Sequence, residues 1–405
     1  MIEFRLIIFS AAFRRLKNSL GEPLLASPSF LNPTMSSFAD NISSRMSVAD
    51  PFRIPIGEGR PAAAYQSVHK LHKQAVQAYQ RGDFRTAFSF EHETLQELLE
   101  VFREDKSGDM VPVLLAVSRN TRDLGHQSGQ LLVAEPTIKK CFVGCLKNNL
   151  KKWGSVEMAN QLMWIYFRTT NFKLCSTLLP QVDRATSKMG KMTMDDVPMS
   201  HRVTCKYYRG RLALFSLDPK VAEESLDFAF QHCAVSSPHN KRLILHSLVP
   251  AKLLHGIYPA SALLEKYNCQ QYIQLVNAVK HGHIGEFEET VKKNQVFFIK
   301  KGLFMLIPWI RMLLHRNLFY QIFQANTDAE KPHHLDLNKC EIIMTSLSNG
   351  TKTYDKNIVQ CILAGLIDHK FIKGYLSYSK NVMVLNHKKN PFQPVTPNMF
   401  KRPSQ

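Results

Sequence analysis

The stretch 354–386 changes from a helical to a strand-like pattern of apolar positions. Side chains alternate with period two over 371–378, which predicts a strand, and a turn leads to a second predicted strand over 382–385. Before these strands, apolar residues recur at three- and four-residue steps and predict a helix that Asp355 or Asn357 caps. The apolar positions of this helix are Val359, Ile362, Leu363 and Leu366.

The residues before this stretch supply the front half of a winged helix. Residues 334–337 predict a short strand, and Asn338 is the expected cap of a helix that ends near Leu347. A Ser-Asn-Gly turn at 348–350 separates that helix from the next one. The order strand, helix, helix, hairpin predicts a winged helix. An ordinary α+β tail without a binding role is the alternative.

Helical patterns fill nearly all of the preceding chain, from about Ala62 onward. An apolar stripe over 65–79 stops at a Gly-containing corner, and a second stripe follows over 87–102. Hairpins of this kind cannot bury their own apolar faces and must stack on neighbours. They therefore predict an α-solenoid of degenerate tetratricopeptide-like hairpins, with a non-repetitive helical bundle as the alternative. The corners that separate the predicted helices are 81–84, 169–172, 217–219 and 283–287.

Other signals refine the helical part. A polar linker over 187–199 precedes a predicted helix over 199–217. Pro250 inside a helical pattern is expected to bend its helix, and Gly256 suits a helix C-terminus. The last predicted helix covers 302–323, and its apolar face is expected to dock on the winged helix.

These patterns divide the chain into five segments. The first twenty residues mix apolar and basic side chains, and Glu3 is their only acid. A transit peptide or a signal anchor would look similar, but we favour a disordered or variable extension. The predicted segments are this extension over 1–60, N-terminal helical repeats over 61–200, a helical part over 201–325, a winged helix over 326–395 and a tail over 396–405.

The chain carries a strong excess of basic residues. Its 52 Lys and Arg against 33 Asp and Glu give a formal net charge of +19 at pH 7. From Lys300 onward, 15 Lys and Arg stand against 6 Asp and Glu, so about half of the excess lies in the last quarter. Such an excess favours an acidic partner, which is nucleic acid, an acidic protein segment or an anionic membrane. A basic face that is only solvated is the plainer alternative.

Motifs for catalysis and metal binding do not occur in the sequence. It contains no Gly-x-Gly-x-x-Gly, Gly-Lys-Ser/Thr, His-Glu-x-x-His or Gly-x-Ser-x-Gly pattern. The eight cysteines form no Cys-x-x-Cys pair, and the adjacent His333 and His334 fall in a loop. No apolar run reaches the roughly 18 residues that a membrane span needs. We therefore expect a non-enzymatic protein without metal or cofactor, from a reducing compartment.

Several stretches, in the same order, resemble the PCI domain-containing protein 2 family, whose members are mRNA-export subunits. The resemblance covers roughly residues 60–395 and is loose over the N-terminal repeats and over 324–352. The stretches that carry it are the Arg-Val-Thr-Cys-Lys-Tyr-Tyr-Arg-Gly-Arg segment at 202–211 and residues 226–233, 240–245, 263–267, 316–319, 359–364, 373–377 and 390–392.

The resemblance implies a mainly α fold, a helical solenoid that ends in a winged helix, together named a PCI domain. It also implies a non-catalytic scaffold subunit of a transcription-coupled mRNA export complex at the nuclear pore. The implied partners are a large PCI-containing scaffold subunit, a small acidic disordered subunit, RNA or DNA, and nuclear-pore components. The implied location is the nucleus, in part at the pore, with a cytoplasmic pool as well. A scaffold of a signalosome- or proteasome-lid-type assembly, with the winged helix used only for subunit contacts, is the alternative.

The residues themselves indicate two candidate binding surfaces. Lysines around the predicted helix and wing suit contact with phosphates, and Tyr375 and Tyr378 suit stacking on bases. No row of base-reading Arg or Asn is present, so we expect weak sequence selectivity. The candidate nucleic-acid-binding residues are Lys356, Lys370, Lys373, Tyr375, Lys380, Lys388 and Lys389, and the candidates for contact with an acidic partner are Lys241, Arg242 and Lys252.

Overall fold

The computed structural model divides into two compact units, residues 1–208 and 209–405, and each is described by itself. The division falls inside helix α11, Met199–Phe215. The five-segment division expected from the sequence places a boundary at residue 200 and stays a prediction. The structure describes residues 62–187, 192–326, 332–350, 352–387 and 390–400, so the candidates Lys388 and Lys389 lie outside the described residues.

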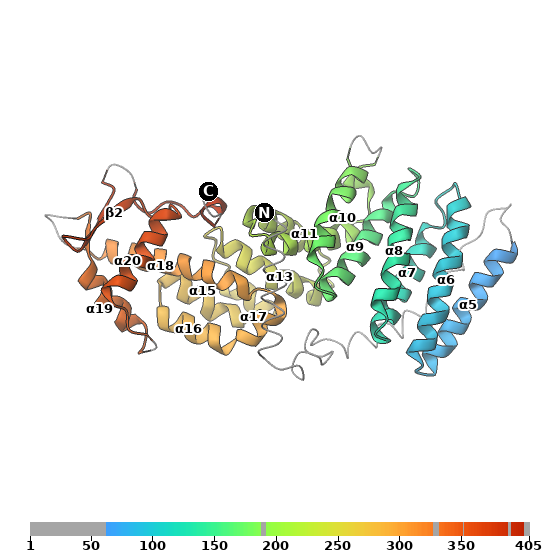
Figure 1. Ribbon diagram of the computed structural model, residues 1–405, viewed down its shortest axis with the longest axis horizontal. Coiled ribbons are helices and arrows are strands. Elements are labelled where there is room, and N and C mark those ends of the chain that lie inside the picture. Colours follow the sequence, from blue (N-terminus) through green and yellow to red (C-terminus); the bar gives the residue numbers. More distant parts are fainter. Residues whose placement is uncertain (1–61, 188–191, 327–331, 351, 388–389, 401–405) are drawn as a thin grey trace. The chain divides into compact units, whose positions relative to one another are not determined.

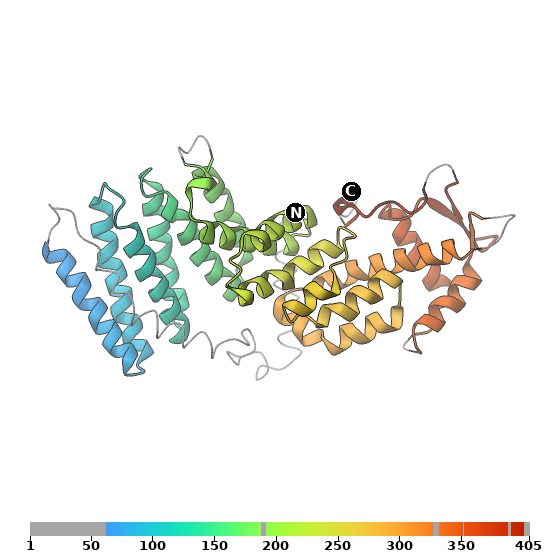
Figure 2. The same ribbon diagram turned by 180° about the vertical axis from the view of Figure 1, so that it is seen from behind.

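Antiparallel helices that follow one another side by side build the N-terminal unit (Figures 1 and 2). Each helix contacts the next, and α6 and α7 also contact α8 and α9, the helices two further on. This nearest-neighbour packing is typical of a helical solenoid and confirms the predicted fold class. The helices of this unit are α5 Ala62–Gln80, α6 Phe84–Glu104, α7 Val111–Gln127, α8 Leu131–Leu146, α9 Trp153–Arg168 and α10 Phe172–Ala185, followed by a 3-10 turn at Met194–Asp196.

The first corner of this unit shows how short sequence signals set the helix ends. Gly82 has φ of +80°, a left-handed conformation that ends α5. The side chain of Asp83 then accepts a hydrogen bond from the Thr86 N–H at 3.1 Å and caps α6. The predicted break at 81–84 is therefore present, and the predicted corner at 169–172 likewise separates α9 from α10.

Helices also form the first part of the C-terminal unit. Asp218 caps α12, because its side chain accepts from the Val221 N–H at 3.3 Å. Pro250 lies near the end of α13, four residues before the C-cap Leu254, and Gly256 follows with φ of +72°. The helices are α12 Pro219–His232, α13 Pro238–Leu253, α14 Ser261–Lys266, α15 Gln271–His281, α16 Ile284–Lys293, α17 Gln295–Lys301 and α18 Ile307–Gln324, with a 3-10 turn at Phe304–Leu306 before α18.

Two predicted boundaries in this region are wrong. Residues 284–287 of the corner expected at 283–287 are already helical, because Gly282 adopts φ of +68° and ends α15 just before α16 starts at Ile284. The helix expected to start at residue 302 starts at Ile307 instead. Gly302 adopts φ of +73° and ends α17, and a 3-10 turn intervenes. In both cases a glycine with left-handed backbone geometry forms the corner.

The winged helix is present, with strand β1 His334–Asp336, helices α19 Leu337–Leu347 and α20 Lys356–Asp368, and strands β2 Gly374–Ser377 and β3 Val382–Leu385. The three strands form an antiparallel sheet in the order β1-β3-β2. The cap of α19 is not Asn338, as expected, but Asp336, whose side chain accepts from the Asn338 N–H at 2.9 Å. Asp336, two residues earlier in the chain, therefore caps α19 in place of Asn338.

The C-terminal segment ties the winged helix to α18. Phe392 packs edge-on against Tyr320 at 5.4 Å between ring centroids, and Trp309 contacts Phe400 at 5.8 Å. A bridge between Ile372 and Phe392 holds the segment beside the strand region, so β2 starts three residues later than the predicted 371. The expected docking of the last long helix on the winged helix is therefore present, and Pro397–Phe400 forms a 3-10 turn with Phe400 buried.

Candidate nucleic-acid interface

Helix α20 occupies the place of a recognition helix, the second helix of the winged helix. Asp355 caps it by accepting from the Ile358 N–H at 2.7 Å, so one of the two expected caps is used. Val359, Leu363 and Leu366 are buried and fix which side of the helix faces the core. The exposed side of α20 carries Lys356, Asn357, Ile358, Cys361, Ala364 and Asp368.

This exposed side carries one lysine and one aspartate, so its net charge is close to zero. Ala364 and Gly365 leave it smooth, because an added Cβ at Gly365 would meet no atom within 4 Å. Base reading usually needs Arg, Asn, Gln or Lys side chains at several positions of such a helix. The geometry of α20 is therefore better suited to close contact with another surface than to sequence-specific readout.

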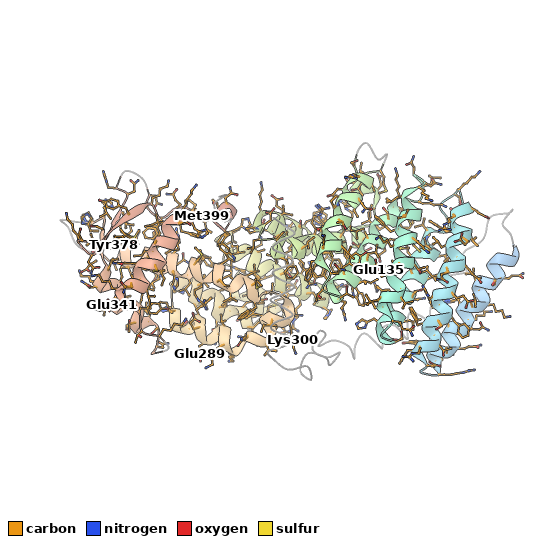
Figure 3. The ribbon with its side chains drawn as sticks, in the orientation of Figure 1. Glu135, Glu289, Lys300, Glu341, Tyr378 and Met399 are labelled. Carbon is orange, nitrogen blue, oxygen red and sulfur yellow. The ribbon has the colours of Figure 1, made fainter. Side chains whose placement is uncertain are left out.

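The hairpin formed by β2 and β3, the wing, carries most of the other candidate residues. Tyr375 is 63 % exposed and Tyr378 is 69 % exposed, which is unusual for large aromatic rings. Tyr375 pairs with Val384 across the hairpin, while Met383 and Leu385 point into the core. Figure 3 shows Tyr378 at the outer end of the unit. Lys380 is exposed in the turn that joins the two strands.

Lys370 and Lys373 lie between α20 and the wing. Lys370 has φ of +62°, and its N–H donates to the Ile367 carbonyl oxygen at 2.9 Å, so it ends α20 in the place that glycine usually takes. Its side chain is exposed, and that of Lys373 is half-buried. The Lys373 N–H donates to the Pro391 carbonyl oxygen at 2.8 Å, which fixes its backbone. A lysine with left-handed geometry costs on the order of 1 kcal/mol relative to glycine.

The structure brings four of the predicted nucleic-acid-binding residues together and places a fifth apart from them. Lys370, Lys373, Tyr375 and Lys380 share the C-terminal end of α20 and the wing, whereas Lys356 lies at the opposite end of α20. A helix of this length separates its two ends by roughly 18 Å. Among the described residues, no ion pair is formed by Lys356, Lys370, Lys373 or Lys380. The wing therefore offers exposed cations beside exposed aromatic rings, which suits phosphate contact and base stacking.

Two of the three residues expected to attract an acidic partner already have partners within the chain. Lys241 is buried, and its Nζ donates to the Phe230 carbonyl oxygen at 2.8 Å. Lys252 pairs with Glu223 at 2.9 Å and Asp227 at 2.8 Å. Burial lowers the pKa of Lys252, but these two carboxylates more than offset that effect and the pKa is raised. Lys241 and Lys252 therefore make contacts within the chain, Arg242 is exposed, and contact of these three residues with an acidic partner stays a prediction.

A cavity of about 670 Å³ behind α20 could not be inferred from the sequence. His315 and Arg311 of α18 line it together with Lys352. The Glu288 carboxylate accepts from Arg311 at 3.1 Å and lies 3.6 Å from the Lys352 Nζ. Burial lowers the pKa of His315 to about 3, so its imidazole is neutral at pH 7. These residues come from separate elements, so no local pattern in the sequence indicates that they lie together.

The described residues hold no group of three or more His, Cys, Asp or Glu side chains that could bind a metal ion. Seven of the eight cysteines are buried, and Cys361 is exposed. Burial raises the pKa of Cys145 and Cys340 to about 12, so both thiols stay protonated at neutral pH. Across the part of the chain that the structure describes, no helix has the length and apolar character of a membrane span.

Comparison with known proteins shows to which family the chain belongs. The chain is 32 % identical to PCI domain-containing protein 2 of Xenopus laevis over 352 residues, which covers 82 % of this chain and 85 % of the relative. It is 33 % identical to the protein of the same name from Danio rerio over 354 residues, with the same coverage. The chain belongs to the PCI domain-containing protein 2 family.

Similarity to the PCI domain-containing protein 2 family extends to plants. The Enhanced ethylene response protein 5 of Arabidopsis thaliana is 26 % identical over 332 residues, which covers 79 % of this chain. No protein-family model matches the chain. PCI-domain proteins are generally non-catalytic scaffold subunits, and a helical solenoid that ends in a winged helix agrees with that role.

Proposed function

We propose that the chain is a non-catalytic scaffold subunit of a transcription-coupled mRNA export complex at the nuclear pore. It pairs there with a larger PCI-containing subunit and a small acidic subunit, and it binds RNA or DNA weakly through its wing. The observation that supports this proposal most is that Lys370 and Lys380 are exposed beside the exposed Tyr375 and Tyr378 and form no ion pair within the described part of the chain. The proposed location is the nucleus, in part at the pore.

Weak and unselective binding follows from the distribution of these groups. The lysines of the wing can neutralise only a few phosphates, and each such contact contributes a salt-dependent term to affinity. The exposed side of α20 adds one lysine and one aspartate, so the helix supplies little attraction and no base readout. Stacking on the two exposed tyrosines favours single strands, because their bases are accessible.

The direct test uses the purified chain together with its large PCI partner. Binding of fluorescein-labelled single-stranded RNA and of double-stranded DNA is followed by anisotropy between 50 and 200 mM salt, a range in which phosphate contacts change affinity strongly. The variant reverses three wing charges, Lys370→Glu, Lys373→Glu and Lys380→Glu. The control reverses three exposed lysines of the N-terminal unit, Lys139→Glu, Lys140→Glu and Lys147→Glu.

The wing variant is expected to bind more weakly and with a flatter salt dependence. Each lost phosphate contact lowers the slope of log K against log salt by about 0.7 to 0.9. The control variant has the same net charge, so a general electrostatic effect would weaken both variants equally. Equal loss in both, or unchanged binding in the wing variant, would exclude the wing as the nucleic-acid interface.

A second candidate function is a scaffold of the signalosome or proteasome-lid type. The small side chains on the exposed side of α20, Cys361, Ala364 and Gly365, favour it, because they allow another subunit to approach closely. A pull-down of the tagged chain from native nuclear extract distinguishes the two candidate functions, with the co-purifying proteins identified by mass spectrometry. A large export scaffold, a small acidic protein and pore components support the export role. Recovery of signalosome or proteasome-lid subunits instead would contradict the export role and support the second candidate function.

A further inference from the structure

Three separate elements of the C-terminal unit build the cavity behind α20. Helix α18, which contacts α20 (Figure 1), contributes Arg311 and His315, and these are one turn apart on the same side of the helix. Helix α20 contributes Ile358 and Ile362 at the same spacing, and the loop that joins α19 to α20 forms the third side. The volume of about 670 Å³ lies within the roughly 300 to 1,000 Å³ that is usual for binding pockets.

Hydrogen bonds to α19 hold the loop side of this pocket in place. The Ser348 hydroxyl donates to the Lys352 carbonyl oxygen at 2.6 Å, and the Tyr354 N–H donates to the Thr345 hydroxyl oxygen at 3.2 Å. Ser348 and Tyr354 are both buried. The loop is therefore part of the packed structure, and it keeps Lys352 and Tyr354 at the pocket.

His315 brings a buried polar atom to the pocket. The residue is 7 % exposed, and among the described residues its Nε2 has no hydrogen-bond partner. Because burial, and then the charges of Arg311 and Lys352, lower its pKa to about 3, the imidazole is neutral at pH 7. A neutral imidazole has one nitrogen that donates a hydrogen bond and one that accepts. A ligand with a polar group at this place would remove the cost of the unpaired nitrogen.

Two cations and one carboxylate leave the pocket with one positive charge in excess. The Glu288 Oε1 lies 2.9 Å from the Arg311 Nε and 3.6 Å from the Lys352 Nζ, so one carboxylate serves both cations. Within the part of the chain that the structure describes, neither cation pairs with a second carboxylate, and the Arg311 Nη1 and Lys352 Nζ donate no hydrogen bond. Asp355 and Lys356, next to the loop, do not line the pocket and offset each other. A ligand with a single negative charge therefore balances the site.

We propose that this pocket binds the C-terminal residue of a partner peptide, which has a free carboxylate and a branched apolar side chain. The carboxylate contacts Arg311 and Lys352. The apolar side chain packs on Ile358 and Ile362, and the last peptide group forms a hydrogen bond with His315. In a C-terminal residue these three groups leave from one carbon atom, so they can meet three neighbouring surfaces at once. Capture of a chain end by its carboxylate is a recurrent mode of peptide recognition.

A chain end fits this pocket better than an anionic group in the middle of a chain. A phosphate dianion exceeds the single positive charge in excess, and Glu288 would repel it. An internal aspartate or glutamate has no apolar group on the same carbon atom as its carboxylate, so it leaves Ile358 and Ile362 uncovered. The pocket is lined by none of the candidate residues of the wing, so this proposal does not depend on the proposed contact with nucleic acid.

The experiment measures binding of fluorescein-labelled glycine–serine peptides to the full chain by anisotropy. The peptides end in leucine with a free carboxylate, in leucine with an amidated carboxyl group, or in glycine with a free carboxylate. We expect the first peptide to bind at least about tenfold more tightly than the other two. The amidated peptide loses the charge-assisted hydrogen bonds, and the glycine peptide loses the apolar contact.

A charge reversal on the loop tests the contact with the carboxylate. Lys352→Glu is expected to weaken binding of the leucine peptide at least about tenfold, because the positive charge in excess becomes a negative one. Lys356→Glu is the matched control, since Lys356 is exposed, lies four residues further along the chain and does not line the pocket. It is expected to leave binding unchanged.

An exposed isoleucine of α20 tests the apolar contact. Ile358 is 42 % exposed, and Ile358→Asn is expected to remove the preference for leucine over glycine at the peptide end. Ile342, which is exposed on α19 and does not line the pocket, supplies the control Ile342→Asn, and that variant is expected to keep the preference. A thermal melt of each variant checks that the fold is intact.

Competition by small acids distinguishes a peptide end from a free acid. N-acetyl-leucine has the carboxylate, the side chain and an amide group, whereas isocaproate has the first two alone. We expect N-acetyl-leucine to displace the leucine peptide at a concentration lower by roughly threefold or more, because the amide group alone can bond to His315. Equal competition by isocaproate would assign the pocket to a free small acid instead.

Three further outcomes would overturn the proposal. Equal binding of the amidated and free-carboxylate peptides would show that Arg311 and Lys352 do not bind a carboxylate. Equal loss of binding in Lys352→Glu and Lys356→Glu would reduce the effect to general electrostatic attraction. No binding of any peptide by the folded chain would exclude a chain end as the ligand. The wing experiment uses nucleic acid and other lysines, so failure of one proposal does not imply failure of the other.

Discussion

Replacement of Gly282 by alanine tests how the corner between α15 and α16 is held against α18. A Cβ at this position would lie 2.7 Å from the Cα and 2.9 Å from the backbone nitrogen of Leu318. Because these are backbone atoms of a helix, they cannot move aside as a flexible side chain could. Gly282 also has φ of +68°, a conformation that disfavours any Cβ.

Gly350 supplies the matched control within the same unit. It has φ of +73°, but an added Cβ there would meet no atom within 4 Å. Gly350→Ala therefore carries only the conformational cost, about 1 kcal/mol. Gly282→Ala carries that cost and an overpacking term of about 1 to 3 kcal/mol. We expect a loss of about 2 to 4 kcal/mol in the free energy of unfolding for Gly282→Ala.

Urea unfolding followed by tryptophan fluorescence measures the difference. Trp309 lies on α18 and contacts His369 at 5.4 Å between ring centroids, so it reports the C-terminal unit. The other two tryptophans, Trp153 and Trp164, are replaced by Phe in every variant. At a slope of about 1 to 3 kcal/mol per molar urea, the expected loss moves the midpoint by about 0.7 to 4 M. If the free energies of unfolding of the Gly282→Ala and Gly350→Ala variants differ by less than about 0.5 kcal/mol, the close contact of Gly282 with α18 is refuted.

Three further predictions concern buried or exposed groups. Lys241→Met is expected to destabilise the chain by about 1 to 3 kcal/mol in urea unfolding, because the half-buried carbonyl oxygen of Phe230 in α12 loses its donor. Lost partner binding at unchanged stability would contradict this structural role. The pKa of His315 is about 3 in the folded protein, below the pKa of the same side chain in the unfolded chain. As the pH falls, the unfolded chain therefore binds a proton at this histidine before the folded protein does. Stability should therefore fall as the pH drops below about 6.5, by up to about 1.4 kcal/mol per pH unit, and His315→Gln should reduce that slope in melts between pH 7 and 4. Among the cysteines of the described residues, Cys361 alone is exposed and should react first with a maleimide, at one equivalent, as intact mass shows; a Cys361→Ser chain that still reacts equally fast would contradict the assigned burial.

Features that depend on nearby residues could be predicted from the sequence. The N-caps Asp83 and Asp355 each bind an N–H three residues away, so a short window contains both groups of the interaction. The hairpin of the wing follows from alternation and a turn in one segment, and its exposed Lys380 could be anticipated in the same way. The candidate residues of the wing were therefore accessible to sequence reasoning as a set.

Local competition explains the boundaries that were predicted wrongly. Asp336 and Asn338 both suit a cap, and nothing within that window favours one over the other. Gly282 and Gly285 both suit a corner. The choice depends on α18, because the backbone of Leu318 passes within 3 Å of the place where a side chain on Gly282 would stand. Only the packed structure contains that information.

The helical character of the chain, its terminal winged helix and its basic composition follow from the order of residues alone, since periodicity and charge are properties of that order. Tertiary structure alone decided which cations are available for binding. Lys241 and Lys252 are occupied by groups on α12, whereas Lys370 and Lys380 are exposed and, among the residues that the structure describes, form no ion pair. The energy of a charge depends on its burial and on its neighbours within a few ångströms, and folding sets both.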